Sequence, residues 1–451
     1  MTDRSSTSPS AAKERAARLP AIVPSPLPRL DTWIVAIFAV ALILRLLWAL
    51  EVECSPRAVW RWDMTLYDYQ AHALAEGDGY IDYSGNPTAH WPPGYPAALA
   101  AVYHFTDDSL LGARLLNVVA GSLTVVLVYL LGARVFGRAA GLAGAALLAV
   151  FPNQVFYTSL VMTEPLFTAL FVMILTLTAY AALGAKPPRL WHMVSIGALI
   201  GLASLVRGEA LLLAPLVALA LLLRWRSWRK VAEYSVVLVV GTVLIVAPWT
   251  ARNVVRMKAL IPISTSATEA LWVGHHEGAD GKIADFGVVG TAYAGLPNPE
   301  LEVKTSNEAL RQALTFMRSR PLDELQLVPK KFAALYKGDG SALRWMQLDT
   351  PTIRPSLADG LWALSNTFYR VVLVLALLGL PAWFSLRDSS KALLVTVVVA
   401  WTALFSIVFF GDERFHFSVI PIFCLWAGAA LTTGGQFILR EWRKRADKAA
   451  V

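Results

Sequence analysis

The stretch that decides the fold is Arg61-Trp62-Asp63-Met64-Thr65-Leu66-Tyr67, followed by His90-Trp91-Pro92-Pro93-Gly94-Tyr95-Pro96. Together these residues form the first polar loop after a hydrophobic run at residues 32–50. That run is long enough to cross a bilayer and lacks a small-residue cleavage site before Glu51, so we interpret it as an uncleaved membrane anchor. Basic residues before the anchor place the N-terminus in the cytoplasm and the polar loop on the outer side of the membrane.

The composition excludes an ordinary soluble protein. Hydrophobic residues make up 56% of the 451 residues, charged residues make up only 16%, and the mean hydropathy is +0.53. These values are typical of a polytopic membrane protein. The net charge of +8 does not indicate nucleic-acid binding, because the basic residues come in short clusters between apolar runs, which is the pattern that orients membrane helices.

The remaining apolar runs predict further membrane-spanning helices, about ten in all with the anchor. A helix rises about 1.5 Å per residue, so residues 94–105 reach only about 18 Å against about 30 Å of hydrocarbon. We therefore expect that run to be an interfacial or re-entrant helix within the outer loop. The predicted spans are residues 32–50, 109–133, 140–158, 165–183, 190–206, 209–223, 233–249, 361–384, 392–410 and 416–437.

The distribution of Lys and Arg supports this arrangement, because basic clusters fall at every second connection. With those connections in the cytoplasm, Asp63, Glu164, Arg207, Arg414 and residues 250–360 all lie on the outer side. The basic clusters are Arg134/Arg138, Lys186/Arg189, Arg224/Arg226/Arg229/Lys230, Arg387/Lys391 and the C-terminal run Arg440/Arg443/Lys444/Arg445/Lys448.

The predicted fold class is therefore an all-α polytopic membrane protein. Pro-rich residues 250–360 include an amphipathic helical pattern at Asn307–Ser319, and we expect them to form a cap on the outer membrane face. The predicted organisation is a disordered cytoplasmic tail at 1–30, an N-terminal transmembrane module at 31–249 with a catalytic first outer loop at 51–108, the outer-face cap at 250–360, C-terminal transmembrane helices at 361–437 and a basic cytoplasmic tail at 438–451.

Charged side chains gather on the predicted outer side. Asp63 and Glu164 supply carboxylates, while Arg45, Arg114, Arg207, Arg252 and Arg414 supply guanidinium groups. A carboxylate that accepts a proton and arginines that hold a phosphate suit transfer from a lipid-phosphate donor to a hydroxyl.

Simpler interpretations of these residues stay open. Arg45 and Arg114 fit arginines that extend to the lipid headgroups, Glu164 fits an acid favoured at a helix start, and Asp63 fits a solvated loop carboxylate. The pair His275-His276 alone is a weak metal-binding signal.

Several motifs, in order along the chain, resemble the GT-C superfamily of polytopic glycosyltransferases, in the branch of the protein O-mannosyltransferases and the lipid A aminoarabinose transferase. The resemblance runs from the anchor to the last span. The motifs are Asp63-x-x-x-Tyr67, Gly77-Asp78-Gly79-Tyr80, Trp91-Pro92-Pro93-Gly94-Tyr95-Pro96, Ala113-Arg114-Leu115-Leu116, Thr163-Glu164-Pro165-Leu166, Leu205-Val206-Arg207, Pro248–Thr265 with Leu271-Trp272-Val273-Gly274, and Arg414-Phe415-His416-Phe417.

The resemblance implies a GT-C-like helical bundle in which an aspartate of the first outer loop acts as the base and the donor is a sugar on a polyprenyl phosphate. It places the catalytic carboxylates at Asp63 and Glu164. The chain departs from the aminoarabinose and mannose branches, because Met64 follows Asp63 where an acidic pair is frequent, and Thr88-Ala89-His90-Trp91 precede Pro92. The sugar and the acceptor therefore stay open. The predicted substrate-binding residues are Tyr67, His90, Arg114, Arg207, Arg252, Arg414 and His416.

The leading hypothesis is a membrane glycosyltransferase that uses a polyprenyl-phosphate sugar and a hydroxyl of a glycan, lipid or protein on the extracytoplasmic face of the cytoplasmic membrane. The alternatives are a transporter or flippase of lipid-linked sugars and a membrane scaffold without chemistry. A transporter favours repeat symmetry and polar residues reachable from both sides, whereas the candidates here lie on one side. The sequence predicts no certain cofactor and leaves a divalent metal ion open.

Overall fold

The protein is described by a computed structural model that covers residues 32–55, 63–184, 186–284, 286–349, 353–383 and 388–449. Within these residues the secondary structure is helical, apart from turns and one isolated bridge between Ile81 and Pro87. The prediction of an all-α membrane protein is confirmed. The predicted tail at residues 1–30 and the residues Arg61 and Trp62 lie outside the described residues.

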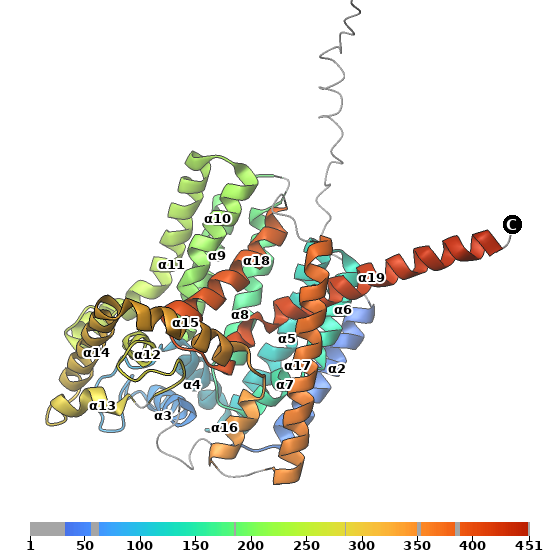
Figure 1. Ribbon diagram of the computed structural model, residues 1–451. Coiled ribbons are helices and arrows are strands. Elements are labelled where there is room, and N and C mark those ends of the chain that lie inside the picture. The colour runs from blue at the N-terminus through green and yellow to red at the C-terminus, as the bar shows by residue number, and fades with distance from the viewer. Residues whose placement is uncertain are drawn as a thin grey trace, which may run out of the picture.

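The helices form a bundle with shorter helices gathered at one end (Figure 1). The bundle is built from α2 (Thr32–Glu51), α5 (Leu110–Val135), α6 (Arg138–Ala149), α7 (Pro152–Phe156), η1 (Tyr157–Ser159), α8 (Glu164–Leu177), η2 (Thr178–Ala182), α9 (Leu190–Val206), η3 (Gly208–Leu212), α10 (Leu213–Trp225), α11 (Trp228–Met257), α17 (Pro355–Trp383), α18 (Ser389–Ala403), η5 (Leu404–Val408), η6 (Glu413–Val419) and α19 (Ile420–Ala449). The shorter helices are α3 (Asp63–Glu76), α4 (Gly94–Thr106), α12 (Ser266–Gly274), α13 (Gly287–Gly290), η4 (Thr291–Tyr293), α14 (Glu300–Ser319), α15 (Pro321–Tyr336) and α16 (Ser341–Asp349).

Nine of the ten predicted spans coincide with single helical runs of the described residues, the one predicted at 140–158 is a bent pair, and the chain is a multi-pass membrane protein. In the described part of the chain, eight helices are long and apolar enough to cross a bilayer, and a bent pair raises the number to nine. Helix α9 is apolar but shorter, with 17 residues. The eight are Thr32–Glu51, Leu110–Val135, Glu164–Ala182, Gly208–Trp225, Trp228–Met257, Pro355–Pro381, Ser389–Val408 and Glu413–Gly434.

The bent pair replaces the single span predicted at residues 140–158. Helix α6 ends at Ala149, and the chain resumes as α7 and η1 after a turn of 60°. The break follows from Phe151-Pro152, because the residue before a proline is driven out of the helical region and proline donates no backbone hydrogen bond. The buried Arg45 guanidinium donates to the carbonyl oxygens of Leu148 at 3.2 Å and Ala149 at 2.9 Å. Arg45 therefore closes the end of α6 rather than extending to the headgroups.

Helix α4 has 13 residues, in accord with the short helix expected at 94–105. It packs against α3, α5 and α9. At its first residue, Gly94, a Cβ atom would lie 2.7 Å from the backbone of Leu205, so only glycine allows α4 to approach the end of α9 this closely. This contact places the Trp91-Pro92-Pro93 run beside the chain that leads to Arg207.

Residues 258–349 fold as a layer of helices over one end of the bundle (Figure 1). The predicted amphipathic helix at Asn307–Ser319 is part of α14, whose buried Ala309 and Ala313 join a small apolar core with Trp272, Val273, Val289 and Phe410. Helices α11, α17 and α19 run through the boundaries that we expected at residues 249, 361 and 437. The cap is thus continuous with the spans on both sides.

Candidate active site

Two carboxylates and two arginines from four distant parts of the chain form one network. Arg414 donates from Nη1 to Asp63 Oδ2 at 2.7 Å and from Nε to Glu164 Oε1 at 2.9 Å. Arg207 donates from Nη1 to the same Glu164 oxygen at 2.9 Å and to Thr163 Oγ1 at 3.1 Å. Its Nε donates to Glu209 Oε1 at 2.6 Å. The four residues that the sequence placed on one side of the membrane therefore meet at one end of the bundle.

Each of these side chains lies at a helix terminus. Asp63 begins α3, Glu164 begins α8 directly before Pro165, Arg207 lies between α9 and η3, and Arg414 lies in the first turn of η6. Acidic residues are favoured at helix N-termini, where the backbone N–H groups lack partners. Local helix-start preferences therefore place the two carboxylates at helix N-termini, and packing of the spans brings the two arginines next to them.

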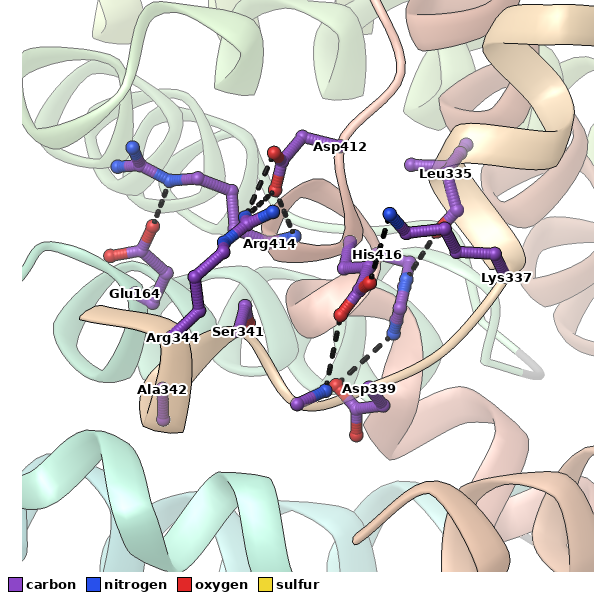
Figure 2. Close-up of polar contacts among 12 residues, drawn as sticks. Glu164, Leu335, Lys337, Asp339, Ser341, Ala342, Arg344, Asp412, Arg414 and His416 are labelled. Atoms are coloured by element: carbon purple, nitrogen blue, oxygen red, sulfur yellow. Dashed lines mark hydrogen bonds and ion pairs between the residues drawn. The ribbon is translucent and has the colours of Figure 1, made fainter. Parts of the chain in front are cut away.

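Asp412 orients Arg414 from the preceding turn. Its Oδ1 accepts a hydrogen bond from the Arg414 backbone N–H at 2.9 Å. Arg344 of α16 donates to both Asp412 oxygens, at 2.7 and 2.9 Å. Figure 2 shows Arg344 reaching Asp412 while Arg414 turns to Glu164. The cap therefore holds the loop that carries Arg414.

The network keeps unused hydrogen-bonding atoms. Its two guanidinium groups face three carboxylates, of which Glu164 has 1% of its side chain exposed and Asp63 has 18%. Asp63 uses only Oδ2, and the Nη2 atoms of Arg207 and Arg414 form no hydrogen bond with another described residue. One carboxylate oxygen and two guanidinium nitrogens are thus available to a bound molecule.

Aromatic rings surround the network. Tyr67 follows Asp63 by one helical turn, and its buried ring contacts Trp91 and Tyr95 edge-on at 5.8 and 5.5 Å between centroids. Burial, reinforced by the Asp63 charge, raises the pKa of Tyr67 well above its ordinary value of 10. Tyr67 therefore stays a neutral hydroxyl. Arg414 also lies over the Trp345 ring, with 5.3 Å to its centroid.

A further carboxylate near the site was not singled out from the sequence. Glu269 of α12 lies 3.4 Å from His90, measured from Oε2 to Nε2. Burial raises the pKa of Glu269; the neighbouring His90 opposes this rise and the charge of Asp63 adds to it. The sequence signal was limited to the motif Leu271–Gly274 close by.

The other three predicted binding residues do not join the network. Arg252 donates to the backbone oxygens of Thr88 at 2.7 Å and Tyr80 at 2.5 Å, and so clamps the first loop. Arg114 donates to Ala49 O at 2.8 Å and thereby ties α5 to α2. His416 lies two residues after Arg414 but is fully buried against Asp339, 3.2 Å away, and Leu335 O, 2.6 Å away (Figure 2).

No group of three or more His, Cys, Asp or Glu side chains in the described ranges is arranged to hold a metal ion. His275, the first residue of the His275-His276 pair, contacts Glu324, Lys331 and the carbonyl oxygen of Val408.

Comparison with known proteins identifies related sequences for part of the chain. Residues 90–251 match the family model described as dolichyl-phosphate-mannose-protein mannosyltransferase. An undecaprenyl phosphate-alpha-4-amino-4-deoxy-L-arabinose arabinosyl transferase of Pseudomonas aeruginosa strain UCBPP-PA14 is 30% identical over 212 residues. That match covers 44% of this chain and 37% of the relative, so it spans less than half of either protein.

Solved structures of similar fold cover almost the whole chain. ArnT from Cupriavidus metallidurans, bound to undecaprenyl phosphate, aligns with 89% of this chain and 60% of its own, with a TM-score of 0.53 and 18% identity. The archaeal oligosaccharyltransferase AglB from Archaeoglobus fulgidus, in complex with an inhibitory peptide and a dolichol-phosphate, aligns with 93% of this chain and 52% of its own, with a TM-score of 0.52 and 16% identity. The GT-C-like fold that the motifs implied is confirmed.

Proposed function

We propose that the protein transfers a sugar from a polyprenyl-phosphate donor to an acceptor hydroxyl on the extracytoplasmic face of the cytoplasmic membrane. The observation that carries this proposal is the network in which Arg414 joins Asp63 to Glu164 and Arg207. A proton acceptor and two phosphate-binding groups within one site are what transfer from a phosphate leaving group to a hydroxyl requires.

In the proposed reaction the bond between the sugar carbon and the phosphate oxygen breaks, and the acceptor oxygen forms a glycosidic bond with that carbon. The acceptor proton passes to Asp63, whose Oδ1 forms no hydrogen bond with another described residue. Polyprenyl phosphate leaves as an anion that the Nη2 atoms of Arg207 and Arg414 hold. Glu164 binds both arginines and sets the spacing of these donors.

The relatives support the donor class. The curated relative is described as using undecaprenyl phosphate carrying an amino sugar, and the matched family model is described by dolichyl-phosphate-mannose. A phosphate-linked lipid sugar is the chemistry common to both. The alternation of basic clusters supports an outer location for the site and cytoplasmic termini.

The test is transfer by the purified protein in nanodiscs that contain a labelled polyprenyl-phosphate sugar and a set of hydroxyl acceptors. The expected result is a new glycosidic bond and free polyprenyl phosphate in equal amounts, detected by mass spectrometry. Parallel reactions with and without a chelator test the divalent metal. Movement of intact donor between leaflets, with no bond formed across glycan, lipid and peptide acceptors, would instead establish a flippase.

A further inference from the structure

A polar cavity lies on the other side of the loop that carries Arg414 from the network. Its volume is about 450 Å³, and its lining includes Lys337, Trp362, Thr367, Arg370 and Glu413. Figure 2 shows Lys337 to one side of this loop and Glu164 with Arg414 to the other. The cavity is therefore a neighbour of the proposed reaction centre and shares none of its contacts.

The cavity borders the exposed apolar surface of α17. Exposed apolar residues run along this helix, among them Leu357, Leu364, Val371 and Leu378. Arg370 is exposed on the same helix and is the sixteenth of its 29 residues. An unpaired ionisable side chain within a span is costly and calls for a partner of opposite charge.

The described residues do not supply that partner. Arg370 forms no ion pair with any of them. The buried Glu413 carboxylate lies 3.5 Å from Lys337 Nζ and accepts a hydrogen bond from the Gly340 backbone at 3.2 Å. Lys337 therefore neutralises Glu413, and the charge of Arg370 is left in excess. The cavity can accept an anion with a single net negative charge.

Lys337 directly follows the cap helix α15, so the cavity lies at the level of the cap, where the anion that a bilayer supplies is the phosphate of a lipid headgroup. Arginine matches a phosphate with two parallel N–H donors, and Lys337 can turn from Glu413 toward the same group. The exposed Thr367 hydroxyl, one helical turn before Arg370, offers a third donor. The exposed apolar face of α17 would receive the acyl chains.

We propose that this cavity is a binding site for the phosphate headgroup of a membrane phospholipid, held by Arg370 and Lys337. The site does not depend on the transfer reaction, since none of these residues contacts Asp63, Glu164 or Arg207. The site would bind one lipid beside the loop that positions Arg414.

Native mass spectrometry of the protein released from nanodiscs containing phosphatidylglycerol tests the site. The wild type should retain one lipid that Arg370→Gln and Lys337→Gln each lose about tenfold more readily, since a charge-assisted hydrogen bond corresponds to roughly 10- to 150-fold in an equilibrium constant. Arg229→Gln, which removes an exposed arginine from the start of α11, is the matched control and should retain the lipid as the wild type does. Arg370→Lys should restore part of the binding and shows that the pocket is folded.

Three results would overturn the proposal. Equal lipid retention by the wild type and Arg370→Gln would show that Arg370 does not bind the lipid. Equal retention of a diacylglycerol, which has the same tails and no phosphate, would show that only the tails bind. Displacement of the lipid by millimolar inorganic phosphate, with phosphate alone bound in its place, would assign the cations to a soluble anion.

Discussion

The ion pair between Asp63 and Arg414 should contribute measurably to folding, because it is well shielded from solvent. The two side chains are 18% and 12% exposed, and the atoms Oδ2 and Nη1 are 2.7 Å apart. A hydrogen bond to a charged group contributes about 1.5–3 kcal/mol to stability. A double-mutant cycle with Asp63→Ala and Arg414→Met should therefore give a coupling free energy of about 1.5–3 kcal/mol.

The assay is equilibrium unfolding by SDS in mixed micelles, followed by tryptophan fluorescence, for the wild type, the two single variants and the double variant. The matched control is the cycle on Glu300 and Lys304, whose pair has a similar length of 2.8 Å but side chains 54% and 46% exposed. That cycle should give about 0.3–0.5 kcal/mol. A coupling below about 0.5 kcal/mol for Asp63 and Arg414 would refute the network, because independent sites add within that limit.

Three further predictions concern the donor, the cap and the membrane orientation. Arg207→Ala and Arg414→Ala should each weaken binding of polyprenyl phosphate about tenfold or more, as measured by competition with a labelled donor. Arg252→Ala should not, because Arg252 contacts Thr88 O, Tyr80 O, the Asn253 side chain and two aromatic rings but no residue of the network. Unchanged affinity in both site variants would reduce Arg207 and Arg414 to structural roles. Burial lowers the pKa of Lys331 to about 8 from an ordinary 10.5. Between these two pH values the unfolded chain therefore binds more protons than the folded chain, and the free energy of unfolding should rise with pH, by at most about 1.4 kcal/mol per pH unit. This slope, measured as the unfolding free energy in mixed micelles, should disappear in Lys331→Met, and a slope that persists would exclude Lys331 as its source. Reporter fusions after Gly77, Thr163 and Glu277 should read outside and fusions after Lys186, Arg226 and Arg440 inside, and an inside reading at Thr163 would separate the two carboxylates.

The sequence predicts the spans well because a bilayer imposes a length that apolar runs reveal directly. It also places Asp63, Glu164, Arg207 and Arg414 at one end, because the basic clusters alternate. The apolar pattern alone does not reveal the break after Val150, although Phe151-Pro152 carries its signal, since apolar residues resume at Val155 only two positions after Asn153. Only the tertiary position of Arg45 shows how the freed carbonyl groups are satisfied.

The groups that a side chain contacts are harder to predict than the side of the membrane on which the residue lies. Arg114, Arg252 and His416 have the residue types and the location of binding residues, yet they contact backbone carbonyls or a buried carboxylate. Glu269 lies far from Asp63 in sequence, and only the packing of the cap on the first loop brings it near. Such contacts depend on helix rotation and on the cap, which hydropathy does not encode.

The measurement that tests the proposed function most directly is the single-turnover rate of Asp63→Asn in nanodiscs with a labelled polyprenyl-phosphate sugar. The substitution keeps the size and polarity of the side chain and removes the proton acceptor. Donor binding should persist, while the rate of glycosidic bond formation should fall by about 10²- to 10⁴-fold, the usual contribution of a general base. A rate within twofold of the wild type, with donor bound equally, would contradict the role of Asp63 as the base.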